Sequence, residues 1–127
     1  RVISNFIVQA LQNKPLTIYG DGSQTRSFCY VDDLIDGLIK LMDSKNTGPF
    51  NLGNPHEISI LKLADLICSK INPSLKFLKK ELPEEDSIKR KPTIDLARDL
   101  LGWEPKISLD NGLNKTISYF KRELKLL

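Results

Sequence analysis

Cysteine, histidine and long apolar runs are all scarce in this sequence. It has two cysteines and one histidine, and neither Cys29 nor Cys68 has a C-x-x-C partner or a nearby histidine. This pattern argues against a zinc site or a disulfide scaffold and favours free thiols in a reducing compartment. No apolar run approaches the roughly 20 residues that cross a bilayer, and no signal peptide opens the chain. We therefore predict a cytoplasmic protein with no metal site and no membrane partner.

An excess of charge is also missing. The chain has 19 basic and 16 acidic residues, spread along its length, and a formal net charge of +3. This bias is too weak to predict nucleic-acid binding, whereas anionic small molecules remain possible partners. The 127 residues, 40% of them apolar, are enough for one domain over 1–127. Because the chain begins at Arg1 in what is already a helical pattern, we expect a fragment of a longer protein.

The apolar pattern predicts a mixed α/β class with short strands. We expect helices at 2–12, 32–43, 60–71, 93–101 and 110–124, and strands at 16–20, 49–53 and 75–79. Ser59 is expected to cap the third helix, and Gly102 to end the fourth. Asp32 and Asp33 lie at the positive end of the second helix, where carboxylates are favoured. The charged segment 79–92 is predicted to be a loop.

The segment "YGDGSQTRSFCYV", residues 19–31, carries the first candidate site. In an extended chain alternate side chains share a face, so Gln24 and Arg26 point the same way. The arginine fork matches two phosphate oxygens, and a glutamine amide beside it adds a neutral donor and acceptor. Gly20 and Gly22 would let the backbone approach a ligand. A hairpin turn followed by a solvated arginine explains the same spacing equally well.

Three other features have weaker signals. Lys89, Arg90 and Lys91 precede Pro92 at the entry to a helix, which suits either an anion site or a solubilising charge run. Trp103, followed two residues later by proline, is typical of a residue that anchors a helix end against the core. His56 has no acidic or thiol partner nearby in the sequence, and we expect it in a loop.

Taken in order, "GDGSQTRSFCYVDDLIDGLIKLM", "FNLGNP" and "KRKPTIDLARDLLGWEPK" resemble the carboxy-terminal portion of the UDP-glucuronate decarboxylases, also called UDP-xylose synthases. These enzymes belong to the extended short-chain dehydrogenase/reductase superfamily of NAD-dependent epimerases and dehydratases. The resemblance covers essentially the whole chain. It implies a substrate-binding domain without its Rossmann core, and the R-K-P form of the loop is more typical of decarboxylases than of sugar dehydratases.

The resemblance also implies roles for particular residues. The strand Leu16, Thr17, Ile18 and Tyr19 would lie against the nucleotide base, and Gln24 with Arg26 would hold the diphosphate. Arg1 falls where an arginine facing substrate or cofactor is expected. Asn51 and Gly53 resemble a strand-to-loop edge beside the site. Arg90 matches the arginine at the sugar end, which would meet the carboxylate or assist protonation after carbon dioxide leaves.

The departures from the family are equally informative. Its members oxidise the sugar with bound NAD, which needs a glycine-rich turn and a Tyr-x-x-x-Lys pair. Neither is present, because Tyr19, Tyr30 and Tyr119 are followed four positions later by serine, leucine and glutamate. We therefore expect NAD in the full-length protein and no cofactor on this chain, which alone should be inactive. The alternatives are a dTDP-glucose dehydratase or epimerase relative, and a non-catalytic module that binds nucleotide sugars.

One further expectation concerns assembly. In the superfamily the helix 32–43 and the strand 49–53 pack against the dinucleotide-binding domain. Leu34, Ile35, Leu38, Ile39 and Met42 form a wide apolar stripe on that helix, and this stripe would lose some of its partners here. Soluble monomers rarely expose large apolar patches, so we expect a homo-oligomer that uses this helix.

Overall fold

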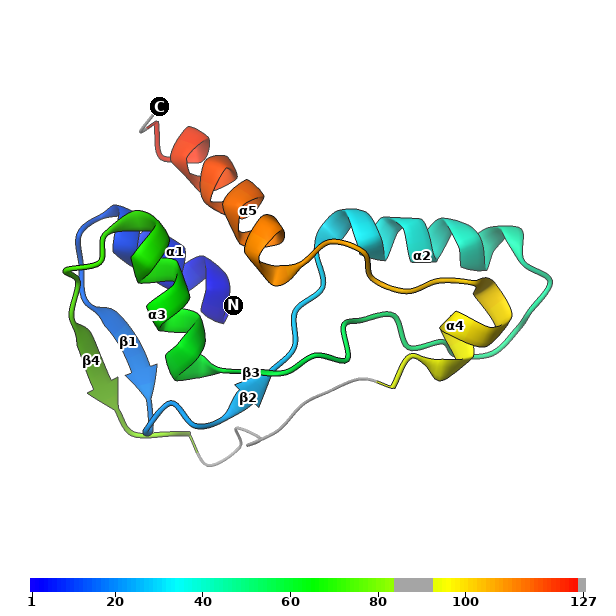
Figure 1. Ribbon diagram of the computed structural model, residues 1–127, viewed down its shortest axis with the longest axis horizontal. Coiled ribbons are helices and arrows are strands. Elements are labelled where there is room, and N and C mark those ends of the chain that lie inside the picture. The colour runs from blue at the N-terminus through cyan, green and yellow to red at the C-terminus, as the bar shows by residue number, and fades with distance from the viewer. Residues whose placement is uncertain (84–92, 126–127) are drawn as a thin grey trace. The chain divides into compact units, whose positions relative to one another are not determined.

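The computed structural model describes residues 1–83 and 93–125 and has the expected mixed α/β composition (Figure 1). Its elements are, in chain order, α1 (Val2–Leu11), β1 (Leu16–Tyr19), β2 (Thr25–Arg26), α2 (Val31–Asp43), β3 (Ile58–Ser59), α3 (Ile60–Ile71), β4 (Phe77–Lys80), α4 (Asp95–Leu101) and α5 (Leu109–Glu123). All five predicted helices and two of the three predicted strands are therefore confirmed, with ends that differ by up to two residues.

By its internal contacts, the described chain separates into two compact units, whereas the sequence predicted one domain. The first unit comprises 1–25, 58–83 and 113–125, and the second comprises 26–57 and 93–112. In the first unit β1 and β4 pair in parallel, and α1 and α3 pack against each other and against β1. The short strands β2 and β3 form a second two-stranded sheet.

The core of the first unit is built from the inner faces of α1, α3, β1 and α5. Its largest fully buried side chains are Phe6, Ile7, Leu16, Ile18, Leu63, Ile67 and Leu113. Helix α3 begins as predicted, since the Ser59 hydroxyl accepts a hydrogen bond from the backbone N–H of Lys62 at 3.2 Å. This cap and the five buried residues of α3 give the unit a closed apolar interior.

The core of the second unit is centred on Trp103, as expected for a helix anchor. Trp103 is fully buried with Ile94 and Ala97, and four half-buried residues pack around them: Cys29, Phe50, Leu52 and Leu101. Helix α4 ends at Gly102, which has a left-handed φ of 62°. That conformation favours glycine and explains the predicted stop.

The strand predicted at 49–53 is wrong. Among the described residues this segment pairs with no other strand, although its side chains Phe50 and Leu52 pack toward Trp103. A strand requires a neighbour with free backbone groups, and apolar composition alone cannot supply one. The loop predicted from residue 79 also begins too early, because Lys79 and Lys80 are the last residues of β4. Residues 84–92 of that loop lie outside the described chain.

Within residues 1–83 and 93–125, no helix is long and apolar enough to cross a membrane.

Candidate functional site

Strand β1 presents only one of its two faces to solvent. Leu16 and Ile18 are fully buried, whereas Tyr19, at the carboxyl end of the strand, is 44% exposed. Thr17 is held by Gln9 of α1, whose amide nitrogen donates to the Thr17 hydroxyl and whose amide oxygen accepts from the Thr17 N–H. Of the four residues predicted to lie against a nucleotide base, Tyr19 is therefore the one with an available ring.

The turn after β1 is closed by protein contacts on both sides. Asp21 accepts a hydrogen bond from the Ser23 N–H at 2.9 Å, and Gly20 donates to the Lys80 carbonyl at 2.7 Å. Hydrogen bonds from the Ser23 side chain and then its backbone lower the pKa of the Asp21 carboxyl. The turn thus has a defined shape before any ligand arrives.

Gly22 has a packing role that the sequence did not predict. Its φ is 78°, and a Cβ built there would lie 2.9 Å from Leu61 Cβ and 3.2 Å from Ile18 Cγ2. Side chains of the first unit fill the space beside this glycine, and the approach of its backbone to a ligand stays a prediction. Gly20, with φ 68°, similarly faces Leu82.

The two residues predicted to hold a diphosphate have different surroundings. Gln24 is only 5% exposed, and its amide nitrogen donates to the Tyr19 carbonyl at 2.9 Å. Arg26 is half-buried in β2. Gln24 belongs to the first unit and Arg26 begins the second. A joint role for the pair remains a prediction.

The remaining predicted residues are placed as follows. Arg1 is exposed, and its carbonyl accepts hydrogen bonds from the N–H of Asn5 and the hydroxyl of Ser4. In the second unit Asn51 is exposed and Gly53 is buried. The strand-to-loop edge expected there is absent, as described above. Arg90, the predicted catalytic residue, lies outside the described residues. His56 lies in an exposed loop, as predicted.

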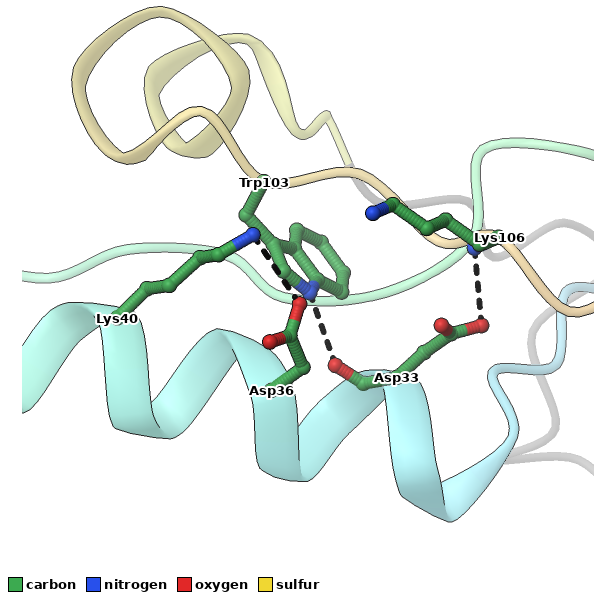
Figure 2. A network of polar contacts seen from close by, with 5 residues as sticks. All are labelled: Asp33, Asp36, Lys40, Trp103 and Lys106. Carbon is green, nitrogen blue, oxygen red and sulfur yellow. Dashed lines mark hydrogen bonds and ion pairs between the residues drawn. The ribbon is translucent and has the colours of Figure 1, made fainter.

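The second unit contains a polar latch between α2 and the segment after α4 (Figure 2). The buried Asp33 carboxylate accepts hydrogen bonds from the N–H groups of Lys106 and Ile107 at 3.0 and 2.9 Å. The Trp103 indole N–H donates to the Asp33 backbone carbonyl at 2.8 Å. From the sequence, Asp33 was expected only to favour the positive end of the helix. No local spacing links it to residues 70 or more positions away, so the latch had no signal in the sequence.

Both cysteines are free thiols with raised pKa values. Burial raises the pKa of each, and the charges of Asp33 and Asp65 raise those of Cys29 and Cys68 further. A raised pKa lowers the thiolate fraction at neutral pH and so lowers reactivity. Among residues 1–83 and 93–125, no three potential metal ligands come together.

Known proteins of one family are similar in sequence to this chain. Residues 1–53 match the NAD dependent epimerase/dehydratase family. The chain is 49% identical over 124 residues to UDP-glucuronic acid decarboxylase 4 of Arabidopsis thaliana and 53% identical over 127 residues to UDP-glucuronic acid decarboxylase 1 of Danio rerio. Each alignment covers 98% of this chain. The chain is therefore similar to NAD dependent epimerase/dehydratase proteins, and similar in sequence to the part of the UDP-glucuronic acid decarboxylases that it spans.

Two solved structures of nucleotide-sugar epimerases contain the fold of this chain. A UDP-glucose 4-epimerase from Thermotoga maritima, solved with UDP-glucose, superposes with a TM-score of 0.93 at 29% identity, over 98% of this chain and 40% of its own. A UDP-glucuronic acid 4-epimerase from Bacillus cereus, solved with UDP-glucuronic acid and NAD, gives 0.90 at 30% identity, over 97% and 40%.

The chain spans only part of these relatives. It covers 28% of the Arabidopsis decarboxylase and 30% of the Danio enzyme. The stretch matched to the epimerase/dehydratase family contains β1, the turn, Arg26 and α2, and Arg90 lies beyond it. The family match therefore includes the segment around the Gln24 turn and does not extend to Arg90.

Proposed function

We propose that this chain is the substrate-binding, carboxy-terminal part of an NAD-dependent UDP-glucuronate decarboxylase that forms UDP-xylose. The observation that supports this choice is the level of identity. The chain is 49% and 53% identical to two decarboxylases and 29% and 30% identical to two epimerases, each over nearly its whole length. A decarboxylase is therefore favoured over the epimerase or dehydratase alternative.

The proposed binding chemistry follows from the side chains at the end of β1 and in β2. The exposed Tyr19 ring offers an aromatic surface to the uracil base. Arg26 offers a planar guanidinium with donors spaced for two phosphate oxygens, and charge-assisted bonds of this kind are about twice as strong as neutral ones. In the same proposal Arg90 receives the sugar carboxylate and Arg1 faces the substrate or the cofactor.

The hydride chemistry is not assigned to this chain. NAD binding in this superfamily needs a glycine-rich turn, and proton transfer needs a Tyr-x-x-x-Lys pair, neither of which occurs in the sequence. The one candidate turn, at Gly20 and Gly22, is packed against Leu82 and Leu61. We therefore propose that the 127 residues bind UDP-sugar without NAD and without turnover. A non-catalytic nucleotide-sugar module is the second candidate, favoured by the same missing groups.

Calorimetry with UDP tests the role of Arg26. Replacing it by alanine should weaken UDP binding by about 1.5–3 kcal/mol, the range for a hydrogen bond to a charged group. Arg98→Ala is the matched control, because Arg98 is an exposed arginine of α4 that pairs with Asp95 and Glu104. An equal loss in both variants would show only a general charge effect and contradict the assignment.

Arg90 is tested separately, in a full-length enzyme that carries this segment. Arg90→Ala should lower turnover of UDP-glucuronate while UDP affinity stays nearly unchanged, because the proposed contact is to the sugar carboxylate. Arg26→Ala should lower the affinity for both ligands. If the two variants lose UDP affinity to the same extent, the proposed division between diphosphate and sugar ends is wrong.

A further inference from the structure

The side-chain amide of Gln24 makes a hydrogen bond within the protein. The side chain folds back over the turn, and its amide nitrogen donates to the carbonyl of Tyr19, five residues earlier. With 5% of its surface exposed, the residue has little contact with solvent. A buried amide must keep its hydrogen bonds, since an unsatisfied one costs roughly 1–3 kcal/mol. Rotating Gln24 outward to meet a ligand would break this bond.

The same turn is joined to the start of α3. Leu61 N–H donates to the Gly22 carbonyl and Ile60 N–H to the Gln24 carbonyl, each at 3.0 Å. These amides belong to the first turn of the helix, whose N–H groups have no partner within the helix. The turn and the Ser59 hydroxyl accept hydrogen bonds from the N–H groups at this end of α3. These N–H groups therefore hold the turn against the helix.

Packing and pairing hold the other side of the turn. Gly22 lies against Leu61 and Ile18, and Gly20 donates to Lys80 at the end of β4. The Tyr19 carbonyl is therefore fixed between a paired strand and the Gln24 amide. Tyr19 is also the exposed residue of β1, so its side chain is accessible to a ligand.

We propose that Gln24 is a positioning residue that holds Tyr19 and the turn in the binding geometry, and that it is not a ligand of the diphosphate. The inference rests on the proposed nucleotide-sugar site. It replaces the earlier pairing of Gln24 with Arg26 by two separate roles, in which Arg26 contacts phosphate and Gln24 acts on the ligand only through Tyr19.

Two ligands separate these roles. Uridine has the base and ribose without phosphate. Mutating a residue that binds the diphosphate should therefore weaken the binding of UDP alone, whereas mutating a residue that acts through Tyr19 should weaken the binding of both ligands. We expect Gln24→Met, which keeps the length but removes the donor, to weaken uridine and UDP binding by the same factor, about three- to tenfold. Arg26→Ala should weaken UDP and leave uridine almost unchanged. Loss of UDP binding alone in Gln24→Met would overturn the proposal.

A second variant distinguishes hydrogen bonding from space filling. Gln24→Glu can donate to the Tyr19 carbonyl only as the protonated acid, and burial favours that form. We expect uridine binding that is weak at high pH, where the carboxyl is ionised, and that recovers as the pH falls and the carboxyl takes up a proton. Gln24→Met should show no such recovery, and uridine is the ligand used because it carries no phosphate charge. No recovery in Gln24→Glu while it stays folded would contradict the hydrogen-bond role.

Amide exchange in the free protein tests the positioning without any ligand. The Ile60 and Leu61 amides should exchange faster in Gln24→Met than in the unmodified chain, while amides at the carboxyl end of α3 remain unchanged. Unchanged exchange at Ile60 and Leu61 would overturn the inference. If the unmodified chain binds neither uridine nor UDP, the proposed function fails, and this exchange measurement still decides whether Gln24 holds the turn.

Discussion

Helices α3 and α2 are of similar length and have opposite patterns of burial. The buried residues of α3 are Ile60, Leu63, Ala64, Ile67 and Cys68, which is the expected apolar stripe. The buried residues of α2 are Asp33 and Gly37. Its apolar residues are exposed instead, by 36–54% for Val31, Leu34, Ile35, Leu38 and Ile39 and by 82% for Met42.

This difference shows that one face of α2 is covered within its unit and the opposite face is exposed. On the covered face Gly37 lies so close to Trp103 and Leu52 that a Cβ would approach them to 3.0 Å, and Asp33 completes the latch. The other face carries the stripe predicted from the sequence. The outer face is therefore an exposed apolar stripe, which soluble monomers rarely leave uncovered.

The largest effect is expected from a charged substitution on the outer face of α2, and it concerns the assembly of the chain. The exposed residues recur at positions 31, 34, 35, 38, 39 and 42, a spacing that lets one helix pack against a second copy of itself. Leu38 is 46% exposed, so burying the rest of it in two copies contributes about 1.5–3 kcal/mol in total, and a glutamate there would also bring an unpaired charge into the contact. We therefore predict that the chain sediments as a dimer or larger assembly and that Leu38→Glu shifts it to monomer.

The control for this experiment is Leu96→Glu, which puts the same charge on α4 at a residue that is 57% exposed. It should leave the assembly unchanged, and circular dichroism should show both variants folded. Sedimentation of the unmodified chain as a folded monomer over a wide concentration range would mean that the stripe has no partner of this kind.

The next effect concerns the covered face. Trp103→Ala should lower the free energy of unfolding by about 3–5 kcal/mol, the usual cost of removing a large buried aromatic side chain. Trp103→Phe keeps most of the volume and loses the N–H to the Asp33 carbonyl, so about 1–3 kcal/mol is expected. Urea unfolding measures both. A smaller loss for alanine than for phenylalanine would contradict the account of Trp103 as the centre of this core.

A smaller loss of stability is expected when one glycine in each unit is replaced by alanine. Gly22 and Gly102 both have positive φ, but Gly22 is packed against Leu61 whereas nothing lies within 4 Å of a Cβ at Gly102. Alanine at Gly102 should therefore show only backbone strain, about 1–2 kcal/mol. Alanine at Gly22 adds overpacking of about 1–3 kcal/mol. Equal losses in thermal unfolding would show that the turn is looser than its contacts indicate.

Local signals in the sequence predicted most of the helices and their ends. Ser59 capping α3, Gly102 ending α4 and the apolar spacing of α1 act over a few residues, and all are present in the structure. The strand at 49–53 was predicted from composition alone and is wrong. Phe50 and Leu52 are apolar because they pack toward Trp103, and strand pairing depends on a neighbour that local sequence does not reveal.

The candidate site was predicted less completely than the fold. The sequence pointed to Gln24 and Arg26 through their two-residue spacing, but it could not show that the Gln24 amide turns back to Tyr19. It also gave glycine its usual interpretation at Gly22, where the close neighbour is Leu61. The Gly22 contact joins residues about 40 positions apart, and the direction of the Gln24 side chain depends on how the turn packs, so neither has a local signal in the sequence.

The most direct test of the central claim is a titration of the 127-residue chain with UDP-glucuronate and with NAD, together with an assay for released carbon dioxide. The account assigns nucleotide-sugar binding to this chain and the hydride chemistry elsewhere. It predicts heat from UDP-glucuronate binding that Arg26→Ala reduces, no tight binding of NAD and no carbon dioxide. Tight NAD binding, or carbon dioxide release that Arg90→Ala abolishes, would contradict it.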